Sequence, residues 1–409
     1  MDSAEFRLAA ETPHVAAAAS ARIAYFVHDL SDPSVHRRVR MLLAGGASVL
    51  LVGFRRVSKT VAHIEGTQVI NIGRTRDQRL GRRVLSVVGA LARLGRLAPL
   101  LDGVDAVIAR NLDMLPIAAR ARKLYAPRAT LTHECLDIHR LLLSRRLEGS
   151  LLRFYESRQW ANVDLLLTSS PAFVRNYFVP RRFPSKIKLV ENKVLWLDED
   201  GAEARRRGPP PGPPWRIGWF GMIRCRRSLE MLRKLAREAA GAVEVIIRGR
   251  PSDAIFPDFA AEIAGSPHVR FGGLYRNPQD LPAIYSEVHF NWSIDYYEDG
   301  QNSSWLLPNR IYEGSVHGAV PIALARVETA SWLERQGVGV VLDEPVEQRL
   351  ATFFGSLDTN AYSRLAAEVA ALPRAHLVDE RADCRELVSA ICGGSARPRV
   401  EPGYAEAGA

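Results

Sequence analysis

Residues 22–56 read RIAYFVHDLSDPSVHRRVRMLLAGGASVLLVGFRR, and this stretch decides the fold. Its apolar run at 22–27 predicts a buried strand, because a strand covered on both faces needs no polar alternation. Asp32 and Pro33 form an N-cap and first-turn pair that begins a helix, which ends at Gly45-Gly46. A second strand follows at 47–54. Strand, helix and strand in this order make a β-α-β unit, from which parallel sheets are built.

The same alternation continues along the chain. We expect further strands at 104–109, 129–133, 164–168 and 187–190, with helices at 115–124, 151–160 and 171–178. Residues 201–214, GAEARRRGPPPGPP, cannot form a packed element and predict a hinge. The pattern then restarts, with strands at 215–220, 243–247, 268–271, 288–292 and 319–324.

This pattern predicts an α/β protein with two doubly wound Rossmann-like domains facing each other across a cleft. The predicted parts are a leader at 1–20, an N-terminal Rossmann-like domain at 21–200, the proline-rich hinge at 201–214, a C-terminal Rossmann-like domain at 215–392 and a disordered tail at 393–409.

The positive charge of the 409-residue chain, formally +10, is concentrated before the hinge. Residues 1–200 hold 31 Lys and Arg against 19 Asp and Glu, whereas the remainder holds 24 against 26. Either the first half faces an anionic partner, or the excess reflects an arginine-rich proteome. We find no apolar run of transmembrane length and no signal peptide, and we expect the protein in the cytoplasm. The four cysteines lack zinc-ligand spacing and are expected to be reduced thiols.

Several enzyme classes lack their motifs here. No GxGxxG follows the first strand, and Walker A, GxSxG and HExxH patterns are absent. The usual dehydrogenase, P-loop, α/β-hydrolase and zincin classes are therefore excluded. Nucleic-acid binding also lacks its patterns, because the basic residues interleave with leucine rather than with aromatic residues.

Polar residues at strand ends are the first candidates for chemistry, since ligands of open α/β sheets bind at the carboxyl ends of the strands. Asp29 follows the first strand, and His133 ends the strand at 129–133. A histidine and a carboxylate there suit acid–base work or recognition of sugar hydroxyls. The alternative is that they bond locally and cap the next helix.

Two later segments have the chemistry of a nucleotide site. Gly221, Arg224 and Arg227 lie between a strand and a helix N-terminus, a combination that suits a diphosphate, although a solvated basic loop is the alternative. Asn309 and Glu313 lie on a short helix that ends before Gly318. Glu313 could bond vicinal hydroxyls, as acidic residues do with ribose elsewhere.

At these residues the chain resembles the two-domain GT-B glycosyltransferases of the family 4 type, and most of all bacterial exopolysaccharide glycosyltransferases. The resemblance covers about residues 20–390. It is carried by residues 22–56, by VENKV at 190–194 and by PNRIYEGSVHGAVPIA at 308–323.

The resemblance implies a hexosyltransferase that uses a nucleoside-diphosphate sugar and needs no metal or other cofactor. It also implies that the N-terminal domain at 21–200 lies on the acceptor side and that the C-terminal domain at 215–392 binds the nucleotide sugar. Glu313 matches the last glutamate of the family's E-x7-E motif, which bonds the ribose, and Arg227 matches the basic residue on the donor diphosphate. Arg224 is a looser match for its companion. His133 matches the histidine that contacts the transferred sugar, and we count His133 and Asp29 as catalytic candidates. We expect Glu313→Ala and Arg227→Ala each to weaken nucleotide-sugar binding.

The first glutamate of E-x7-E is replaced by Trp305. Glu298, Asp299 and Asn302 are the candidates for its polar role toward the donor sugar.

Two stretches, 78–101 and 140–158, interleave leucine with arginine, including Arg79, Arg82, Arg83, Arg145 and Arg146. Such helices suit an anionic membrane surface, or else pack on their own sheet with the arginines in water. With the first reading, the acceptor is a saccharide, free or linked to polyprenyl diphosphate, and the enzyme is peripheral on the inner face of the cytoplasmic membrane. The alternative function is a catalytically inactive GT-B protein that binds a polyanion or an anionic membrane.

Overall fold

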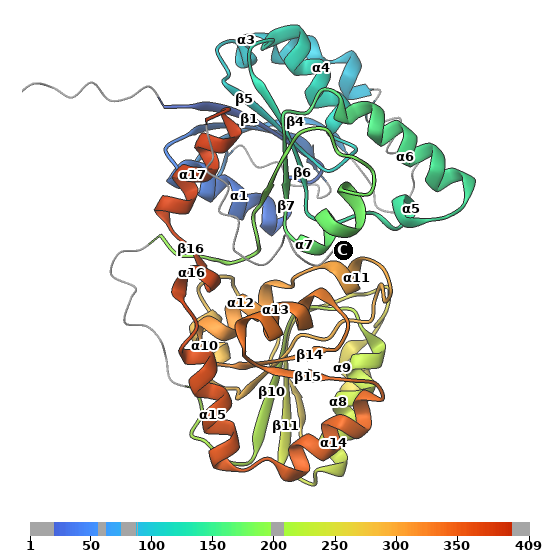
Figure 1. Cartoon of the computed structure of the whole chain (residues 1–409), viewed down its shortest axis with the longest axis vertical. Coiled ribbons are helices and arrows are strands. Elements are labelled where there is room, and N and C mark those ends of the chain that lie inside the picture. The colour runs from blue at the N-terminus through green and yellow to red at the C-terminus, as the bar shows by residue number, and fades with distance from the viewer. Residues whose placement is uncertain (1–19, 56–62, 75–86, 88, 198–207, 395–409) are drawn as a thin grey trace, which may run out of the picture.

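The computed structural model describes residues 20–55, 63–74, 87, 89–197 and 208–394, and it forms two stacked α/β domains (Figure 1). The first half of the chain forms the upper domain in this view, and the second half forms the lower one. Arg79, Arg82 and Arg83 lie outside the described residues, as do most of the expected leader, part of the expected hinge and nearly all of the expected tail.

The first domain is built on an eight-stranded sheet in the order β3-β4-β2-β1-β5-β6-β7-β8. Every neighbouring pair is parallel except the β3–β4 hairpin. Its strands are β1 (Arg22–Val27), β2 (Ser48–Arg55), β3 (His63–Ile64), β4 (Thr67–Arg74), β5 (Ala106–Arg110), β6 (Thr130–Cys135), β7 (Leu165–Thr168) and β8 (Lys186–Leu189). Its helices are α1 (Pro33–Ala44), η1 (Leu94–Leu97), α3 (Ala98–Leu101), α4 (Leu115–Tyr125), α5 (Arg140–Leu143), α6 (Leu147–Trp160), α7 (Pro171–Phe173) and the π-helix η2 (Val174–Phe178).

Strand β1 is buried on both faces, which explains why its sequence is a continuous apolar run. Ile23 and Tyr25 pack into one buried cluster, whereas Ala24 and Phe26 pack into another on the opposite face of the sheet. All four side chains are buried. Helices therefore cover both faces, as a doubly wound sheet requires.

The second domain repeats the arrangement on a six-stranded parallel sheet in the order β12-β11-β10-β13-β14-β15. Its strands are β10 (Trp215–Ile223), β11 (Val243–Pro251), β12 (Val269–Phe271), β13 (Phe290–Trp292), β14 (Val320–Leu324) and β15 (Val340–Leu342). Its helices are α8 (Arg226–Glu238), α9 (Phe259–Ile263), α10 (Leu281–Tyr285), α11 (Asn302–Trp305), α12 (Asn309–Val316), α13 (Glu328–Gln336), α14 (Val346–Ser356) and α15 (Thr359–Ala370).

The end of the chain returns to the first domain. After α16 (Arg374–Leu377), strand β16 (Val378–Asp379) pairs in parallel with β9 (Val194–Leu195), and α17 (Arg381–Ile391) then packs on α1. Figure 1 shows α17 beside α1, in red at the left of the upper domain. The predicted second domain, 215–392, thus includes a helix that joins the hydrophobic core of the first.

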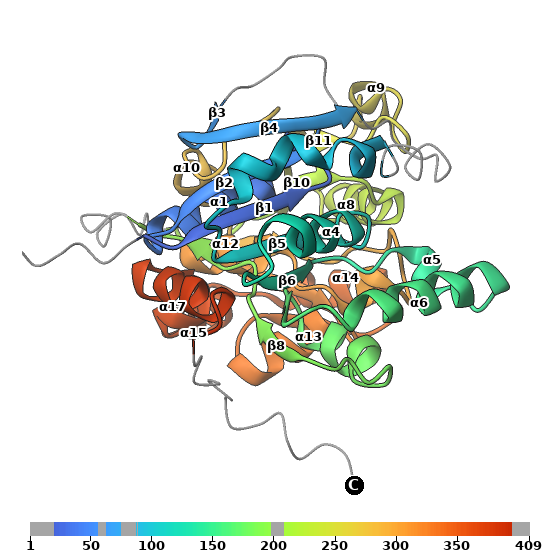
Figure 2. The same ribbon diagram turned by 90° about the horizontal axis from the view of Figure 1, so that it is seen from above.

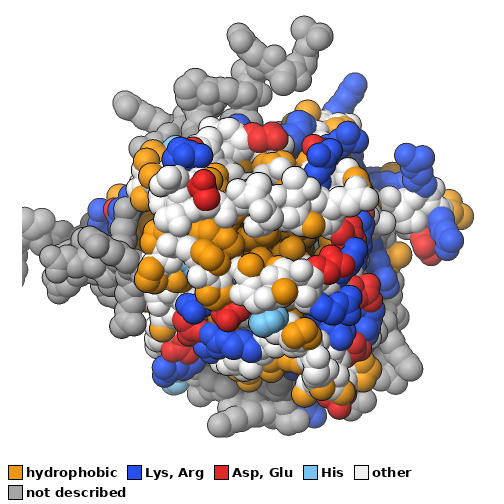
Figure 3. Space-filling view, turned by 90° about the horizontal axis from the view of Figure 1, so that it is seen from below, with side chains coloured by type: hydrophobic (Ala, Val, Ile, Leu, Met, Phe, Trp, Pro, Cys, Tyr) orange, Lys and Arg blue, Asp and Glu red, His pale blue; other side chains and the backbone are white. Residues whose placement is uncertain are grey.

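The second domain carries mixed charge on its far side. Figure 3 views it from below and shows hydrophobic side chains grouped in the middle, with basic and acidic side chains interspersed at the flanks. This agrees with the near balance of charge in the second half of the sequence. Across the described parts of the chain, no helix combines the length and hydropathy needed to cross a membrane.

Candidate functional site

A cavity of about 350 Å³ lies between the two domains. The first domain contributes His28, Asp32, Ser34, Arg110, Asn111, Leu136, Asp137, Ser169 and Asn192. The second contributes Phe220, Gly221, Met222, Arg224, Tyr275, Asn277, Asp295, Leu306, Leu307, Pro308, Asn309, Arg310 and Glu313.

The cavity lies at the carboxyl ends of the strands in both sheets. His28 directly follows β1, Asn111 follows β5, and Asp137 comes two residues after β6. In the second domain, Gly221 and Arg224 mark the end of β10 and the residue after it. Each parallel sheet has a crevice at the carboxyl ends of its strands, and the crevices of the two domains therefore face each other.

Backbone packing brings the β10 end close to its neighbour. A Cβ atom on Gly249 would lie 2.0 Å from the carbonyl oxygen of Gly221, and Gly249 has a φ of +123°. Only glycine tolerates both the contact and the conformation. Gly221 itself lines the cavity.

Glu313 is buried in the second-domain wall. Asn277 Nδ2 donates to Glu313 Oε1 at 2.7 Å, and the Tyr285 hydroxyl donates to Oε2 at 3.4 Å. Burial raises the pKa of Glu313, and the Asn277 hydrogen bond and the nearby Arg310 only partly offset it. The carboxylate is thus held in place at the cavity and can accept hydrogen bonds from ligand hydroxyls.

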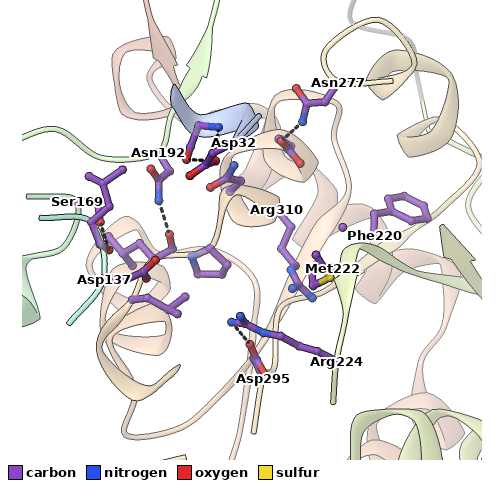
Figure 4. Close-up of a pocket in the computed structure, with 18 of the residues that line it drawn as sticks. Asp32, Asp137, Ser169, Asn192, Phe220, Met222, Arg224, Asn277, Asp295 and Arg310 are labelled. Carbon is purple, nitrogen blue, oxygen red and sulfur yellow. Dashed lines mark hydrogen bonds and ion pairs between the residues drawn. The ribbon is translucent and has the colours of Figure 1, made fainter. Parts of the chain in front are cut away.

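Two arginines point into the cavity from the second domain. Figure 4 shows the guanidinium groups of Arg224 and Arg310 directed toward the same central space. Arg224 Nη2 is 3.1 Å from Asp295 Oδ2, and Arg310 Nη1 donates to the carbonyl of Trp292 at 3.2 Å. Helix α12 begins beside them at Asn309, with no side-chain cap on its N-terminus. Arginine forks and a helix N-terminus are groups that bind phosphate.

The first-domain wall rests on a buried charge network. Glu134 accepts hydrogen bonds from the Tyr25 hydroxyl, from Arg110 Nη1 at 3.0 Å and from Arg38 Nε at 2.6 Å. Burial opposes ionisation of Glu134, but the two arginines and these hydrogen bonds outweigh it and lower its pKa to about 2. Arg110 also donates to Ser34 Oγ. Burial lowers the pKa of its guanidinium, but Tyr25, Glu134 and Asp32 outweigh this and raise that pKa, so Arg110 stays charged at the cavity.

Polar groups in front of this network face the cavity directly. Asn111 Nδ2 lies 3.3 Å from His28 Nδ1, and Asn111 has a φ of +66°. A non-glycine residue in this strained region is common at functional sites. Asp137 is open to the cavity, yet the protein packed around it raises its pKa. Asn302 Nδ2 donates to Asp137 Oδ1 at 3.1 Å.

Four of the donor-site residues predicted from the sequence line this cavity. They are Gly221, Arg224, Asn309 and Glu313. Asn302 lies just behind the cavity wall, where it bonds Asp137 rather than facing the open space.

The two residues predicted to be catalytic are not part of the cavity lining. His133 is fully buried, because strand alternation directs it to the Leu131 face of β6, opposite to Glu134. Burial lowers its pKa to about 4, so the imidazole is neutral near pH 7. Asp29 is buried in a turn, where Oδ1 accepts hydrogen bonds from the Ser31 amide at 2.9 Å and the Ser31 hydroxyl at 2.7 Å.

The remaining predicted donor residues also lie elsewhere. Arg227 stands on the surface, where Nη2 pairs with both oxygens of Glu344 at 2.8 and 2.9 Å and the guanidinium stacks on Tyr296. Asp299 is exposed outside the cavity, and the Glu298 side chain is not part of its lining. Arg145 and Arg146 are exposed immediately before α6 and do not line the cavity.

Arg110, Asp137 and Arg310 were not among the site residues predicted from the sequence. Arg110 directly follows the strand predicted at 104–109, Asp137 comes four residues after the strand predicted at 129–133, and Arg310 lies within the segment at 308–323 that carried the resemblance. Their shared cavity depends on how the two domains meet, which no local pattern records.

A curated relative decides the family. The chain is 43% identical over 394 residues to the succinoglycan biosynthesis protein ExoL of Rhizobium meliloti (strain 1021), covering 95% of this chain and 97% of the relative. The chain belongs to the ExoL family. No family model matches the sequence.

Solved structures show the fold of this ExoL-family chain. Anabaena HepE in complex with UDP-glucose superposes with a TM-score of 0.65 at 13% identity, over 91% of this chain and 99% of HepE. WaaG, a glycosyltransferase involved in lipopolysaccharide biosynthesis, gives 0.59 at 12% identity, over 91% and 100%. The GT-B architecture of two Rossmann-like domains is confirmed. Family and fold together confirm the predicted role of a glycosyltransferase in exopolysaccharide synthesis.

The cavity of this ExoL-family member is lined by charged and hydrogen-bonding side chains. Among the residues that the structure describes, no three His, Cys, Asp or Glu side chains are grouped to hold a metal ion. The cationic groups at the cavity are Arg110, Arg224 and Arg310, and the acidic ones are Asp32, Asp137, Asp295 and Glu313.

Proposed function

We propose that the protein transfers a hexose from a nucleoside-diphosphate sugar to a saccharide linked to polyprenyl diphosphate. The observation that carries this proposal is the meeting of Arg224, Arg310 and Glu313 at one cavity between the domains. It supplies two phosphate-binding forks and a buried carboxylate for the ribose within one site. The complexes of HepE with UDP and with UDP-glucose support this class of donor.

The leaving nucleoside diphosphate gains negative charge as the glycosidic bond breaks. Arg224, Arg310 and the N-terminus of α12 are placed to stabilise that charge without a metal ion. Their orientation is fixed before reaction, because Asp295 holds Arg224 and the Trp292 carbonyl holds Arg310. We therefore expect turnover to be unchanged when divalent ions are chelated.

The acceptor binds on the first-domain side of the cavity. His28, Asn111 and Asp137 offer hydrogen-bonding groups to sugar hydroxyls there, and Arg110 offers a positive charge. The basic balance of residues 1–200 supports an anionic lipid-linked acceptor and a position at the inner face of the cytoplasmic membrane.

The experiment is a panel of nucleotide sugars, with slow release of nucleoside diphosphate as the signal and calorimetry for affinity. Arg224→Ala and Glu313→Ala should each weaken donor binding at least about tenfold, since each removes a charged or buried hydrogen-bonding group. Unchanged affinity in both variants would rule out this donor site. A protein that binds anionic vesicles but hydrolyses no donor would instead be the inactive polyanion binder.

Arg227→Ala is the matched control. The resemblance assigned Arg227 to the diphosphate, but its pairing with Glu344 on the surface now leads us to expect donor affinity close to that of the unmodified protein. A loss equal to that of Arg224→Ala would mean that Arg227 moves into the cavity when the donor binds.

A further inference from the structure

Helix α6 turns a row of large apolar side chains toward solvent. Leu147, Leu151 and Phe154 are 75%, 60% and 62% exposed. Spacings of four and three residues place them on one side of the helix, and Arg158 continues the same row. Figures 1 and 2, at right angles to each other, both show α6 projecting from the body of the first domain.

The opposite side of α6 is anchored, so its outward face is fixed. Glu156 is buried and accepts hydrogen bonds from the Tyr177 hydroxyl at 2.5 Å and from Arg181. The Arg181 guanidinium also lies 4.3 Å from the centre of the Trp160 ring. A Cβ on Gly149 would come within 2.3 Å of the Ser144 carbonyl oxygen, so the turn from α5 is packed tightly. The helix cannot rotate to hide the apolar row without breaking these contacts.

Exposed arginines outnumber exposed acidic residues beside the apolar row, where Glu148 is the acidic residue in the first turn of α6. Arg145 and Arg146 are exposed immediately before the helix, and Arg158 stacks its guanidinium 5.1 Å from the centre of the Phe154 ring. Long arginine side chains can lie along apolar surface while their charge stays at the level of the lipid headgroups. Figure 3 shows a projection at the right that carries basic, hydrophobic and acidic side chains.

A second copy of the chain is a poor occupant for this face. A stable protein interface needs roughly 800 Å² from each partner, well beyond one row of three apolar side chains. A twofold contact would also bring the same arginines against each other. An anionic bilayer accepts both the apolar row and the arginines.

We propose that Leu147, Leu151, Phe154 and Arg158, with Arg145 and Arg146, form a membrane anchor, which we call the α6 face. It inserts its apolar row among the headgroups of an anionic membrane. The inference rests on the proposed function in that a lipid-linked acceptor lies in such a membrane. Only Ile138 and His139 separate the cavity residue Asp137 from α5, so the anchor lies a short distance along the chain from the acceptor side.

The test uses the full-length protein with vesicles of phosphatidylcholine, alone or mixed with phosphatidylglycerol, at low salt. We expect co-sedimentation with the mixed vesicles only. The double variant Leu151→Asp with Phe154→Asp should bind at least about tenfold more weakly, because it places charge among the headgroups and acyl chains. Leu274→Asp is the matched control, since Leu274 is 74% exposed in the second domain. It should bind as the unmodified protein does.

The outcomes separate the two proposals. Equal vesicle binding by the double variant would overturn the α6 face and leave membrane attachment standing. If the unmodified protein does not bind these vesicles, both the α6 face and membrane attachment are overturned. Hydrolysis of the donor would still test the proposed nucleotide site independently. Equal binding to uncharged vesicles would overturn the role of the arginines. A dimer in sedimentation analysis that the double variant dissociates would assign the face to a second copy.

Discussion

Glu134 shows how one buried charge organises the first-domain wall. Its carboxylate holds Arg110 at the cavity surface and Arg38 behind it, and it contacts no solvent. A buried ion pair gives little net stability by itself, but removing one partner leaves the other charge without compensation. The main energetic effect of Glu134 is therefore that its removal would leave the buried charges of Arg38 and Arg110 uncompensated.

Replacing Glu134 with glutamine should lower the free energy of unfolding by about 3–5 kcal/mol at pH 7, because two buried guanidinium groups lose their counter-charge. Unfolding in urea, followed by tryptophan fluorescence, measures this. Glu244→Gln is the control: its pair with Arg216 is at the surface, so a change of at most about 1 kcal/mol is expected. A Glu134 variant as stable as the control would show that the network is dispensable.

The same residue sets a dependence of stability on pH. The folded protein lowers the pKa of Glu134 from 4.5 to about 2. Its contribution to stability is therefore complete above pH 4.5 and is lost as the pH falls toward 2. In urea titrations across that window, the unmodified protein should lose more stability than Glu134→Gln. Parallel curves for the two proteins would contradict the shifted pKa.

At the scale of elements, the sequence was informative wherever a run of apolar residues is long. Strands β1, β2, β10 and β11 were all predicted, because each is covered on both faces and reads as a nearly continuous apolar segment. The short strands β9 and β16 were not, since two residues carry no periodicity. Their pairing depends on the chain crossing back to the first domain.

The packing partner of helix α17 could not be predicted from the sequence either. Its apolar positions Cys384, Leu387, Val388 and Ile391 show that one side is buried, but not against which sheet. Gly45 decides the contact: a Cβ there would lie 2.4 Å from the carbonyl oxygen of Cys384, so α1 and α17 cross closely at the end of α1. Helix α17 follows the second domain in the chain and packs in the core of the first, so it links the two domains.

Leu387→Ala should lower the stability of the first domain by about 2–5 kcal/mol, because it opens a cavity between α1 and α17. Hydrogen exchange resolved by segment measures where protection is lost, and α1 should lose it together with α17. The neighbouring Glu386→Ala is the control, since Glu386 makes only a partly exposed pair with Lys188. Loss confined to the second domain would place α17 in the unit that the sequence first indicated.

At the scale of the whole molecule, the loop before α12 joins the domains. The Ser170 hydroxyl donates to the Trp305 carbonyl, and the Trp305 side chain packs against the core of the first domain. Asn192 Nδ2 donates to the Leu307 carbonyl at 3.2 Å, and Arg175 pairs with Glu328 at 2.8 Å. The tryptophan at the first glutamate position of E-x7-E thus serves contact between domains. The sequence placed Glu313 and Arg224 in one proposed site, and both line the cavity, whereas these contacts between the domains could not be predicted.

Asn302 is the clearest link between domain contact and the site. Its side chain donates to Asp137 and accepts from the Ile138 amide at 3.3 Å, so it spans the two domains behind the cavity wall. Asn302→Ala should lower kcat at least about tenfold while leaving donor affinity within about twofold. The reason is that a small displacement of Asp137 slows turnover more than it weakens donor binding. Turnover and calorimetry on one preparation separate these effects, with the exposed neighbour Gln301→Ala as control. Weakened donor binding at unchanged kcat would return Asn302 to the donor sugar, the role that the sequence suggested, and would mean that the domains align without it.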